Sequence, residues 1–144
     1  MTDAPWILIA DDNKHNREYM RQVFLGRWPV EVVQNGEEAL AVLEERIPAV
    51  LLLDISMPIV DGWETLRRIR ADPRLFPLKV LACTAHSMSG DRERVFAAGF
   101  DGYLPKPYRP HELMEFVESF IGPAPQPAGQ EEGWGGKDWS LDRA

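Results

Sequence analysis

Four short apolar runs in this chain each end in polar side chains that suit one kind of chemistry. Carboxylates bind hard cations such as Mg²⁺, and a carboxylate oxygen is also a nucleophile. Ammonium and hydroxyl groups stabilise phosphoryl oxygens, so the whole set fits phosphoryl transfer. The groups are Asp11 and Asp12 after residues 7–10, Asp54 after 50–53, Thr84 after 78–83 and Lys106 after 102–105.

These groups act together only if the apolar runs are neighbouring strands that point the same way. Residues 50–53 form a short run of branched apolar residues, which is typical of a strand in a parallel sheet that is covered on both faces. Helical spacing of apolar residues between the runs gives an alternation of strands and helices, which predicts an α/β fold with a five-stranded parallel sheet and helices on both faces. The carboxyl ends of such strands share one edge, where ligands bind. The predicted strands are residues 6–10, 30–33, 50–53, 78–83 and 100–104, and the predicted helices are 14–25, 37–46, 62–71, 89–98 and 110–121.

Three carboxylates at one sheet edge would repel one another. Two unit charges about 4 Å apart repel by roughly 4 kcal/mol at an effective dielectric constant near 20, and a bound Mg²⁺ ion would relieve that repulsion. Each acid taken alone also has a simpler interpretation. Asp54 could cap the next helix, and Asp11 with Asp12 could favour the dipole of the helix that follows them.

Lys106 favours the chemical interpretation over the structural one. It follows a predicted strand and precedes Pro107, so its backbone is held stiffly. We expect its ammonium group to pair with Asp54 when the site is empty and with a phosphoryl oxygen when it is filled. Thr84 offers a hydroxyl donor, and the small side chain of Ala85 leaves its backbone N–H open to an oxygen.

The composition narrows the class of protein. The net charge of −7, from 16 basic and 23 acidic residues, disfavours nucleic-acid binding. The single cysteine, Cys83, lies in a predicted strand and is expected to be a core residue outside any disulfide framework. The sequence shows neither a signal peptide nor a run long enough to span a bilayer, so we expect a cytoplasmic protein without membrane association. His15 and His111 are expected at the surface.

The chain changes character after residue 121. We expect a domain over residues 1–121, followed over 122–144 by a Pro/Gly-rich linker and a polar tail. The tail contains Trp134, Trp139 and Leu141, which is unusual for a solvated segment. We therefore expect the stretch 134–141 to dock on a partner or on a second copy.

The order and spacing of the motifs resemble the receiver domain of two-component response regulators, and are similar to the single-domain, chemotaxis-regulator-like receivers. The resemblance covers about residues 6–121 and implies a flavodoxin-like, doubly wound fold with strand order 2-1-3-4-5. The motifs that carry it are Asp11-Asp12, the stretch Asp-Ile-Ser-Met-Pro-Ile-Val-Asp-Gly from Asp54 to Gly62, Thr84-Ala85 and Lys106-Pro107.

The resemblance implies a magnesium ion and a phosphoryl group at the sheet edge. Asp54 would accept the phosphoryl group from a sensor histidine kinase or a histidine phosphotransfer protein. Asp12 and Asp54 would bind Mg²⁺ directly with the Ser56 carbonyl, and Asp11 would act through water. Thr84, Ala85 and Lys106 would hold the phosphoryl oxygens, and the Lys106–Pro107 peptide bond would be cis.

The resemblance also implies a switch. On phosphorylation, Thr84 would move toward the phosphate and Tyr103 would rotate inward, although Tyr103 could instead be a simple packing residue at the sheet edge. Ser56 and His86 flank the path of an attacking water, so they would tune the lifetime of the acyl phosphate.

Three rival interpretations fit the sequence less well. A haloacid-dehalogenase-like phosphatase needs a second acid where this chain has Ser56, and a flavodoxin needs a glycine- and hydroxyl-rich loop where it has Asp11-Asp12. The third is a receiver that works as an unphosphorylated docking module, and the presence of all the site residues argues against it. We expect a stand-alone switch with no fused output domain, which catalyses only its own phosphotransfer and dephosphorylation. It would be a monomer or weak homodimer that signals by contact with a downstream protein.

Overall fold

A computed structural model describes residues 5–55, 57, 59–85 and 91–123. Its five parallel strands form one sheet in the order β2-β1-β3-β4-β5, so the predicted fold class and strand order are confirmed. The strands are β1 (Ile7–Ala10), β2 (Val30–Val33), β3 (Val50–Leu53), β4 (Lys79–Thr84) and β5 (Gly102–Pro105). The helices are α1 (Lys14–Phe24), α2 (Gly36–Glu45), α3 (Gly62–Ala71), α4 (Asp91–Ala98) and α5 (Pro110–Ile121).

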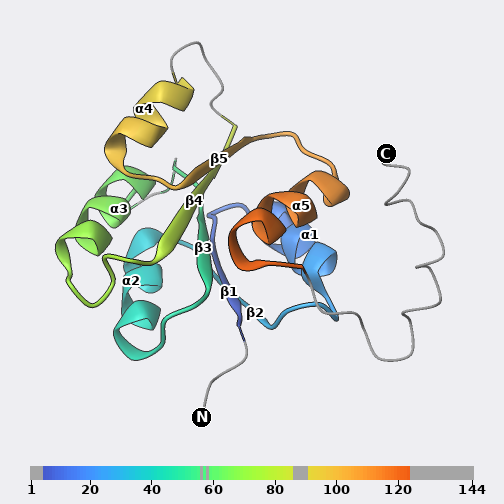
Figure 1. The fold of residues 1–144 in the computed structure, drawn as a ribbon, viewed down its shortest axis with the longest axis horizontal. Coiled ribbons are helices and arrows are strands. Elements are labelled where there is room, and N and C mark those ends of the chain that lie inside the picture. Colours follow the sequence, from blue (N-terminus) through green and yellow to red (C-terminus); the bar gives the residue numbers. More distant parts are fainter. Residues whose placement is uncertain (1–4, 56, 58, 86–90, 124–144) are drawn as a thin grey trace.

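Helices cover both faces of the sheet, with α1 and α5 on one side and α2, α3 and α4 on the other (Figure 1). Successive side chains of a strand point to opposite faces, so each inner strand serves two cores. In β3, Leu51 and Leu53 pack under α2–α4, and Val50 and Leu52 pack under α1 and α5. All four are buried, which explains why the run has no polar alternation.

The predicted boundaries that fall among the described residues agree with the structure to within two residues. Two of the small differences have physical causes. The last strand begins at Gly102 because Phe100 is used in the core, where its ring meets Trp63 edge-on at 5.8 Å. Ile47 continues the helical spacing of α2, but the helix ends at Glu45, and Ile47 is 45% exposed. The start of the predicted helix 89–98 lies outside the described residues, and α4 is described from Asp91.

Side-chain caps start the helices that follow the site strands. The Asn13 side chain accepts a hydrogen bond from the Asn16 backbone N–H, and the Asp61 side chain accepts one from Glu64. Each cap satisfies a backbone donor that the first helical turn leaves unpaired. His15 and His111 are exposed, as expected. In the part of the chain that the structure describes, no helix has both the length and the apolar character needed to cross a membrane.

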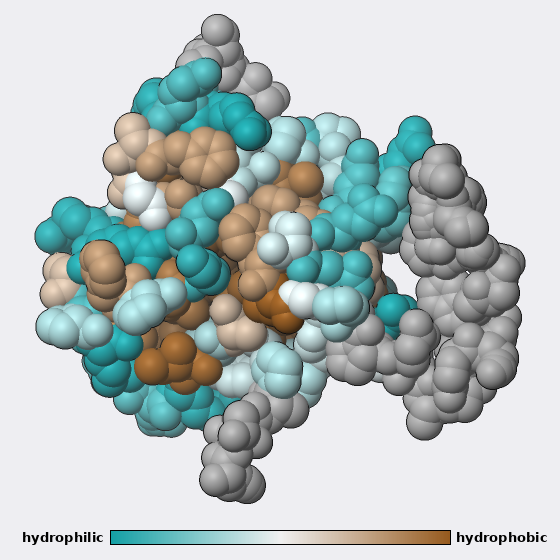
Figure 2. All heavy atoms as spheres, viewed as in Figure 1, coloured by the Kyte–Doolittle hydropathy of each residue, from teal (hydrophilic) through white to brown (hydrophobic). Residues whose placement is uncertain are grey.

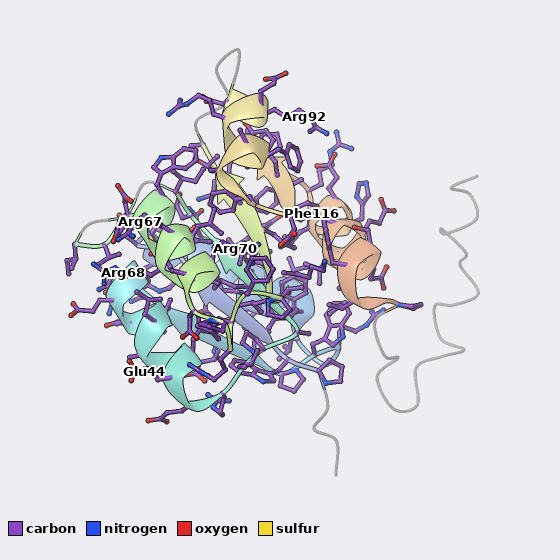
Figure 3. The ribbon with its side chains drawn as sticks, turned by 60° about the vertical axis from the view of Figure 1, so that its left-hand side comes forward. Glu44, Arg67, Arg68, Arg70, Arg92 and Phe116 are labelled. Atoms are coloured by element: carbon purple, nitrogen blue, oxygen red, sulfur yellow. The ribbon has the colours of Figure 1, made fainter. Side chains whose placement is uncertain are left out.

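Arg70 ties α3 to the chain segments that flank β4 and β5. Its guanidinium donates to the carbonyls of Phe76, Leu78 and Gly99 and to the Asp101 carboxylate at 2.8–3.2 Å. Asp101 also accepts from the Val80 backbone N–H at 2.9 Å. Figure 3 shows Arg70 on the sheet side of α3, away from the exposed arginines of that helix. The planar guanidinium thus joins α3 to the segments that precede β4 and β5.

Candidate functional site

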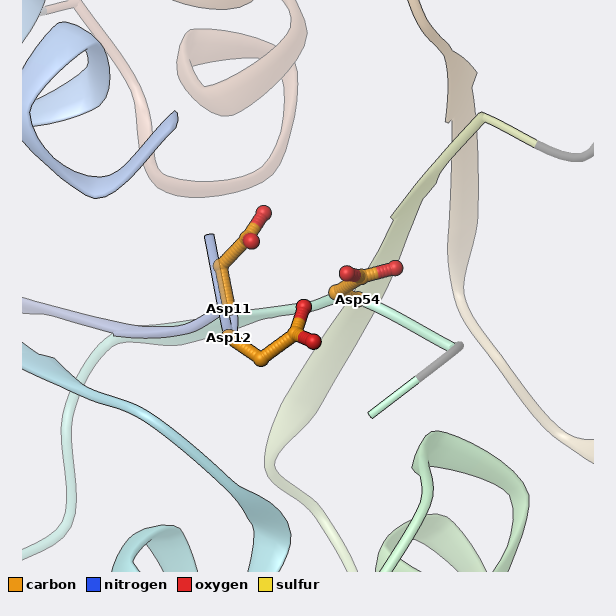
Figure 4. Close-up of side chains that lie close together, drawn as sticks. All are labelled: Asp11, Asp12 and Asp54. Carbon is orange, nitrogen blue, oxygen red and sulfur yellow. The ribbon is translucent and has the colours of Figure 1, made fainter. Parts of the chain in front are cut away.

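The strand register brings the three predicted carboxylates together at the carboxyl edge of the sheet. Ala10 of β1 pairs with Leu53 of β3, so the next residue of each strand, Asp11 and Asp54, leaves the sheet at the same level. The Asp54 backbone N–H donates to the Ala10 carbonyl at 2.9 Å. Carboxylate oxygens of Asp11, Asp12 and Asp54 all lie within 4.8 Å of one another (Figure 4).

The three acids differ in their surroundings. Asp11 is fully buried, Asp54 is 7% exposed and Asp12 is exposed. The Oδ1 atom of Asp11 accepts from the Asn13 backbone N–H at 2.9 Å, and Oδ2 accepts from the Lys106 ammonium at 2.9 Å. Both oxygens of this buried carboxylate therefore have protein partners, as a buried charge requires.

Lys106 lies within ion-pair distance of Asp54, as predicted, but its shorter contact is with Asp11. Its Nζ atom lies 2.9 Å from Asp11 Oδ2 but 3.9 Å from Asp54 Oδ2. The more deeply buried carboxylate takes the hydrogen bond because it cannot exchange the ammonium group for water. The Lys106 backbone N–H donates to the Thr84 carbonyl at 2.9 Å, and the Lys106–Pro107 bond is cis, as predicted.

Close packing holds the loop after Asp54. Gly62 begins α3 directly beneath this loop, and a Cβ atom added there would lie 2.6 Å from Ile55 Cα and 2.7 Å from the Asp54 carbonyl oxygen. The Gly62 backbone N–H donates to the Ile55 carbonyl at 2.9 Å. Only glycine allows α3 to approach this closely, so Gly62 helps to fix where Asp54 stands.

Of the remaining predicted site residues, the structure describes three and leaves two outside the described part of the chain. Thr84 is the last residue of β4 and is buried, and Ala85 after it is exposed. Tyr103 is half-buried in β5 on the α4 side of the sheet, where burial raises the pKa of its phenol and Asp91 raises it further. Ser56 and His86 lie outside the described residues.

Two neighbours of the site were not predicted from the sequence. Cys83 is fully buried, and burial raises the pKa of its thiol to about 12, with Lys106 acting in the opposite direction. Tyr108 packs against the same core, and burial raises the pKa of its phenol, with negative charge at Cys83 and Asp11 adding to the effect. The position of Tyr108, two residues after Lys106, was the only sequence signal for its proximity.

The donor set fits a small divalent cation. Oxygen ligands, two of them largely sheltered from water, and few protein side chains in total are what Mg²⁺ takes. The exposed Asp12 leaves one side of the cluster open for water or for a phosphate oxygen.

Comparison with known families gives one match that spans most of the chain. A model described as the response regulator receiver domain matches residues 7–118. Among curated proteins, the polar-differentiation response regulator DivK of Brucella anthropi is 32% identical over 82% of this chain and 97% of its own length. The response regulator Rre1 of Synechocystis is 37% identical over 84% of this chain, which spans 53% of that relative.

Comparison with solved structures also gives receiver domains and response regulators. The receiver domain of the sensor histidine kinase PA1611 from Pseudomonas aeruginosa, solved with a magnesium ion coordinated in its active site cleft, has a TM-score of 0.75 and 31% identity, covering 83% of this chain and 99% of that one. A response regulator from Chloroflexus aurantiacus has a TM-score of 0.76 and 31% identity, covering 82% and 98%.

Proposed function

This chain belongs to the response regulator receiver domain family, and on that premise we propose that Asp54 is its phosphoacceptor. The donor is a phosphohistidine on a sensor histidine kinase or a histidine phosphotransfer protein. An Asp54 oxygen attacks phosphorus, the P–N bond breaks, and the freed imidazole nitrogen takes a proton from solvent. The product is an acyl phosphate that the same site later hydrolyses.

One observation carries the proposal. Residues from three separate strand ends, Asp11, Asp54 and Lys106, meet within hydrogen-bond or ion-pair distance at the carboxyl edge of the sheet. A structural interpretation of Asp54 as a helix cap does not explain this convergence, because Asp61 already caps α3.

In the proposed site, Mg²⁺ supplies charge neutralisation for the transferred phosphoryl group when it is bound. Asp12 and Asp54 would hold the ion with the Ser56 carbonyl, and Asp11 would contact it through water. The two protein hydrogen bonds already made by the Asp11 oxygens support the indirect role. Thr84, Ala85 and Lys106 hold the phosphoryl oxygens, and Ser56 and His86 tune how fast water removes the group.

We propose that phosphorylation is read out on the face formed by α4, β5 and α5, with Thr84 and Tyr103 as the switch residues. Hydrophobic residues show at the centre of this face, and hydrophilic side chains of the two helices flank them (Figure 2). About two added negative charges at Asp54 would bias a surface that already has two states. The output is a contact between the receiver, residues 1–121, and a downstream protein. In this proposal the receiver is cytoplasmic and acts as a monomer or weak homodimer.

The test is phosphorylation of the full chain with acetyl phosphate and Mg²⁺, followed by intact-mass measurement. We expect the mass of one phosphoryl group to be added to the wild type, with no gain in Asp54→Asn or in wild type with excess EDTA. Asp61→Asn is the matched control, because Asp61 caps α3 seven residues away and should leave the gain intact.

Other outcomes would assign another function. An unmodified wild type would favour the docking-module interpretation, in which the receiver works without phosphorylation. Steady release of phosphate from a phosphomonoester, without a stable adduct, would favour a phosphatase.

A further inference from the structure

A groove of about 450 Å³ lies at the C-terminal end of α1, where the chain turns toward β2. Leu25 supplies exposed apolar surface, and the largely buried Trp28 also lines the groove. Arg27 and Arg21 supply positive charge, although Arg21 also lies 3.8 Å from Glu18. Leu25 is 71% exposed, a large apolar side chain with little cover. The end of α1 that carries the groove is about 16 Å from its start beside Asp11, by the rise of its 11 residues, so the groove is separate from the phosphorylation site.

The described chain ends beside this groove. Helices α1 and α5 both follow parallel strands and return along the same face, so both end at the amino edge of the sheet (Figure 1). Ile121 at the end of α5 packs against the cluster that contains Phe24 and Trp28 from the end of α1 and the turn after it. The sequence continues from Pro123 with residues 124–144, which lie outside the described part.

The composition of that continuation complements the groove. Residues 131–141 contain Trp134, Trp139 and Leu141, and their three acids outnumber the single basic residue, Lys137. Indole rings bury apolar area against exposed leucine and stack on guanidinium groups, and carboxylates pair with arginine. The groove offers the matching apolar wall and two arginines in a chain whose net charge is −7.

We propose that residues 131–141 dock in this groove of their own domain. Trp134 is the eleventh residue after Pro123, a flexible span of about 18 Å, and packed neighbouring helices lie only about 8–10 Å apart. A linker of this length gives an effective concentration on the order of 1 mM. Intramolecular contact therefore reaches half occupancy with an affinity of only about 1 mM, whereas a second copy at micromolar concentration would hardly compete.

The test uses the full chain labelled with 5-fluorotryptophan, which gives one ¹⁹F signal for each of its five tryptophans. Single Trp→Phe variants assign the signals. We expect the signals of Trp134 and Trp139 to be shielded from a soluble paramagnetic agent by about half or more relative to the unfolded chain, independently of protein concentration. Trp28 reports on the groove itself, and Trp63, on the opposite side of the sheet, reports on the fold.

Leu25→Glu places a carboxylate in the groove and should expose both tail tryptophans and shift Trp28, while Trp63 stays unchanged. Arg27→Glu gives a second, chemically independent disruption. Phe76→Glu is the matched control, because Phe76 is also an exposed apolar residue, at 61%, but lies after α3. The control should leave the tail shielded.

Three results would overturn the inference. Tail tryptophans that are as accessible as in the unfolded chain would show that nothing docks. Shielding that grows with protein concentration would place the tail on a second copy, and shielding that survives both groove variants would place it elsewhere on the domain. Asp54→Asn should leave docking intact, so this test and the phosphorylation test can fail separately.

Discussion

Replacing Lys106 by methionine should make the empty site unstable and make it depend on Mg²⁺. The ammonium group lies 2.9 Å from Asp11 Oδ2 and 3.9 Å from Asp54 Oδ2. At an effective dielectric constant near 20, these pairs attract by about 6 and about 4 kcal/mol before desolvation is counted. Methionine keeps most of the volume but leaves the buried Asp11 carboxylate without its cation, and breaking one side of such a pair costs about 3–5 kcal/mol net.

Mg²⁺ should recover part of this loss. Without the ammonium group, three carboxylates within 4.8 Å repel one another with no compensating charge, and a divalent ion meets no competing cation. We expect the Mg²⁺ Kd of the variant to fall about tenfold, which is worth about 1.4 kcal/mol. Both quantities come from urea unfolding of wild type and variant, each with EDTA and with Mg²⁺.

The exposed Lys79 at the start of β4 provides the control, because Lys79→Met removes the same charge away from the acids. It should change stability by less than about 0.5 kcal/mol and leave the Mg²⁺ response alone. The reasoning is wrong if Lys106→Met costs less than about 1 kcal/mol in EDTA, since the ammonium would then not be needed to hold the acids. It is also wrong if Mg²⁺ stabilises wild type and variant equally.

Three further changes test other parts of the fold. Arg70→Ala should destabilise the domain by about 3 kcal/mol in urea unfolding, because three carbonyls and a carboxylate lose their donor. Arg70→Lys should recover only part of this stability. A loss near zero would show that Arg70 does not hold α3 to the neighbouring segments. Gly62→Ala should cost about 1–3 kcal/mol and slow phosphorylation by displacing Asp54; an unchanged rate would contradict the close packing. Burial raises the pKa of the Cys83 thiol from 9.0 to about 12, so above pH 9 the unfolded chain releases a proton that the folded chain keeps, and stability falls toward pH 12. In the wild type this one thiol should lower the free energy of unfolding by up to about 1.4 kcal/mol per pH unit, and Cys83→Ala should lack that contribution when both are unfolded in urea across this range. If stability falls equally with pH in the two proteins, the thiol is not the cause.

The sequence determined the strands of this fold because their patterns are local. Residues 50–53 are all apolar and branched, and the structure buries all four. The local pattern was misleading at two positions. Phe100 has the apolar character of a strand residue, but tertiary packing places its ring against Trp63. Ile47 keeps helical spacing, but α2 has already ended and the side chain is exposed.

The sequence predicted which residues form the site, but not that the Lys106 ammonium group lies closer to Asp11 than to Asp54. Parallel strand ends bring Asp11, Asp54 and Lys106 to one edge, which follows from topology alone. Which carboxylate holds the ammonium group depends on burial, and Asp11 is deeper than Asp54 by an amount that no local pattern reports. The nearness of Cys83 and Tyr108 likewise arises from packing between segments far apart in the chain.

Both faces of β3 are covered by apolar cores, so the two faces of the strand do not differ in polarity. Sliding Val50–Leu53 by one position would exchange one branched aliphatic residue for another in each core, at small cost in burial. The same slip would move the carboxylate that follows by about 3.3 Å, out of its place beside Asp11 and Lys106. The position of the reactive group is therefore set by the backbone register of β3 with β1 and β4 and by the close contact of Gly62 with the loop, and not by the apolar side chains of the strand.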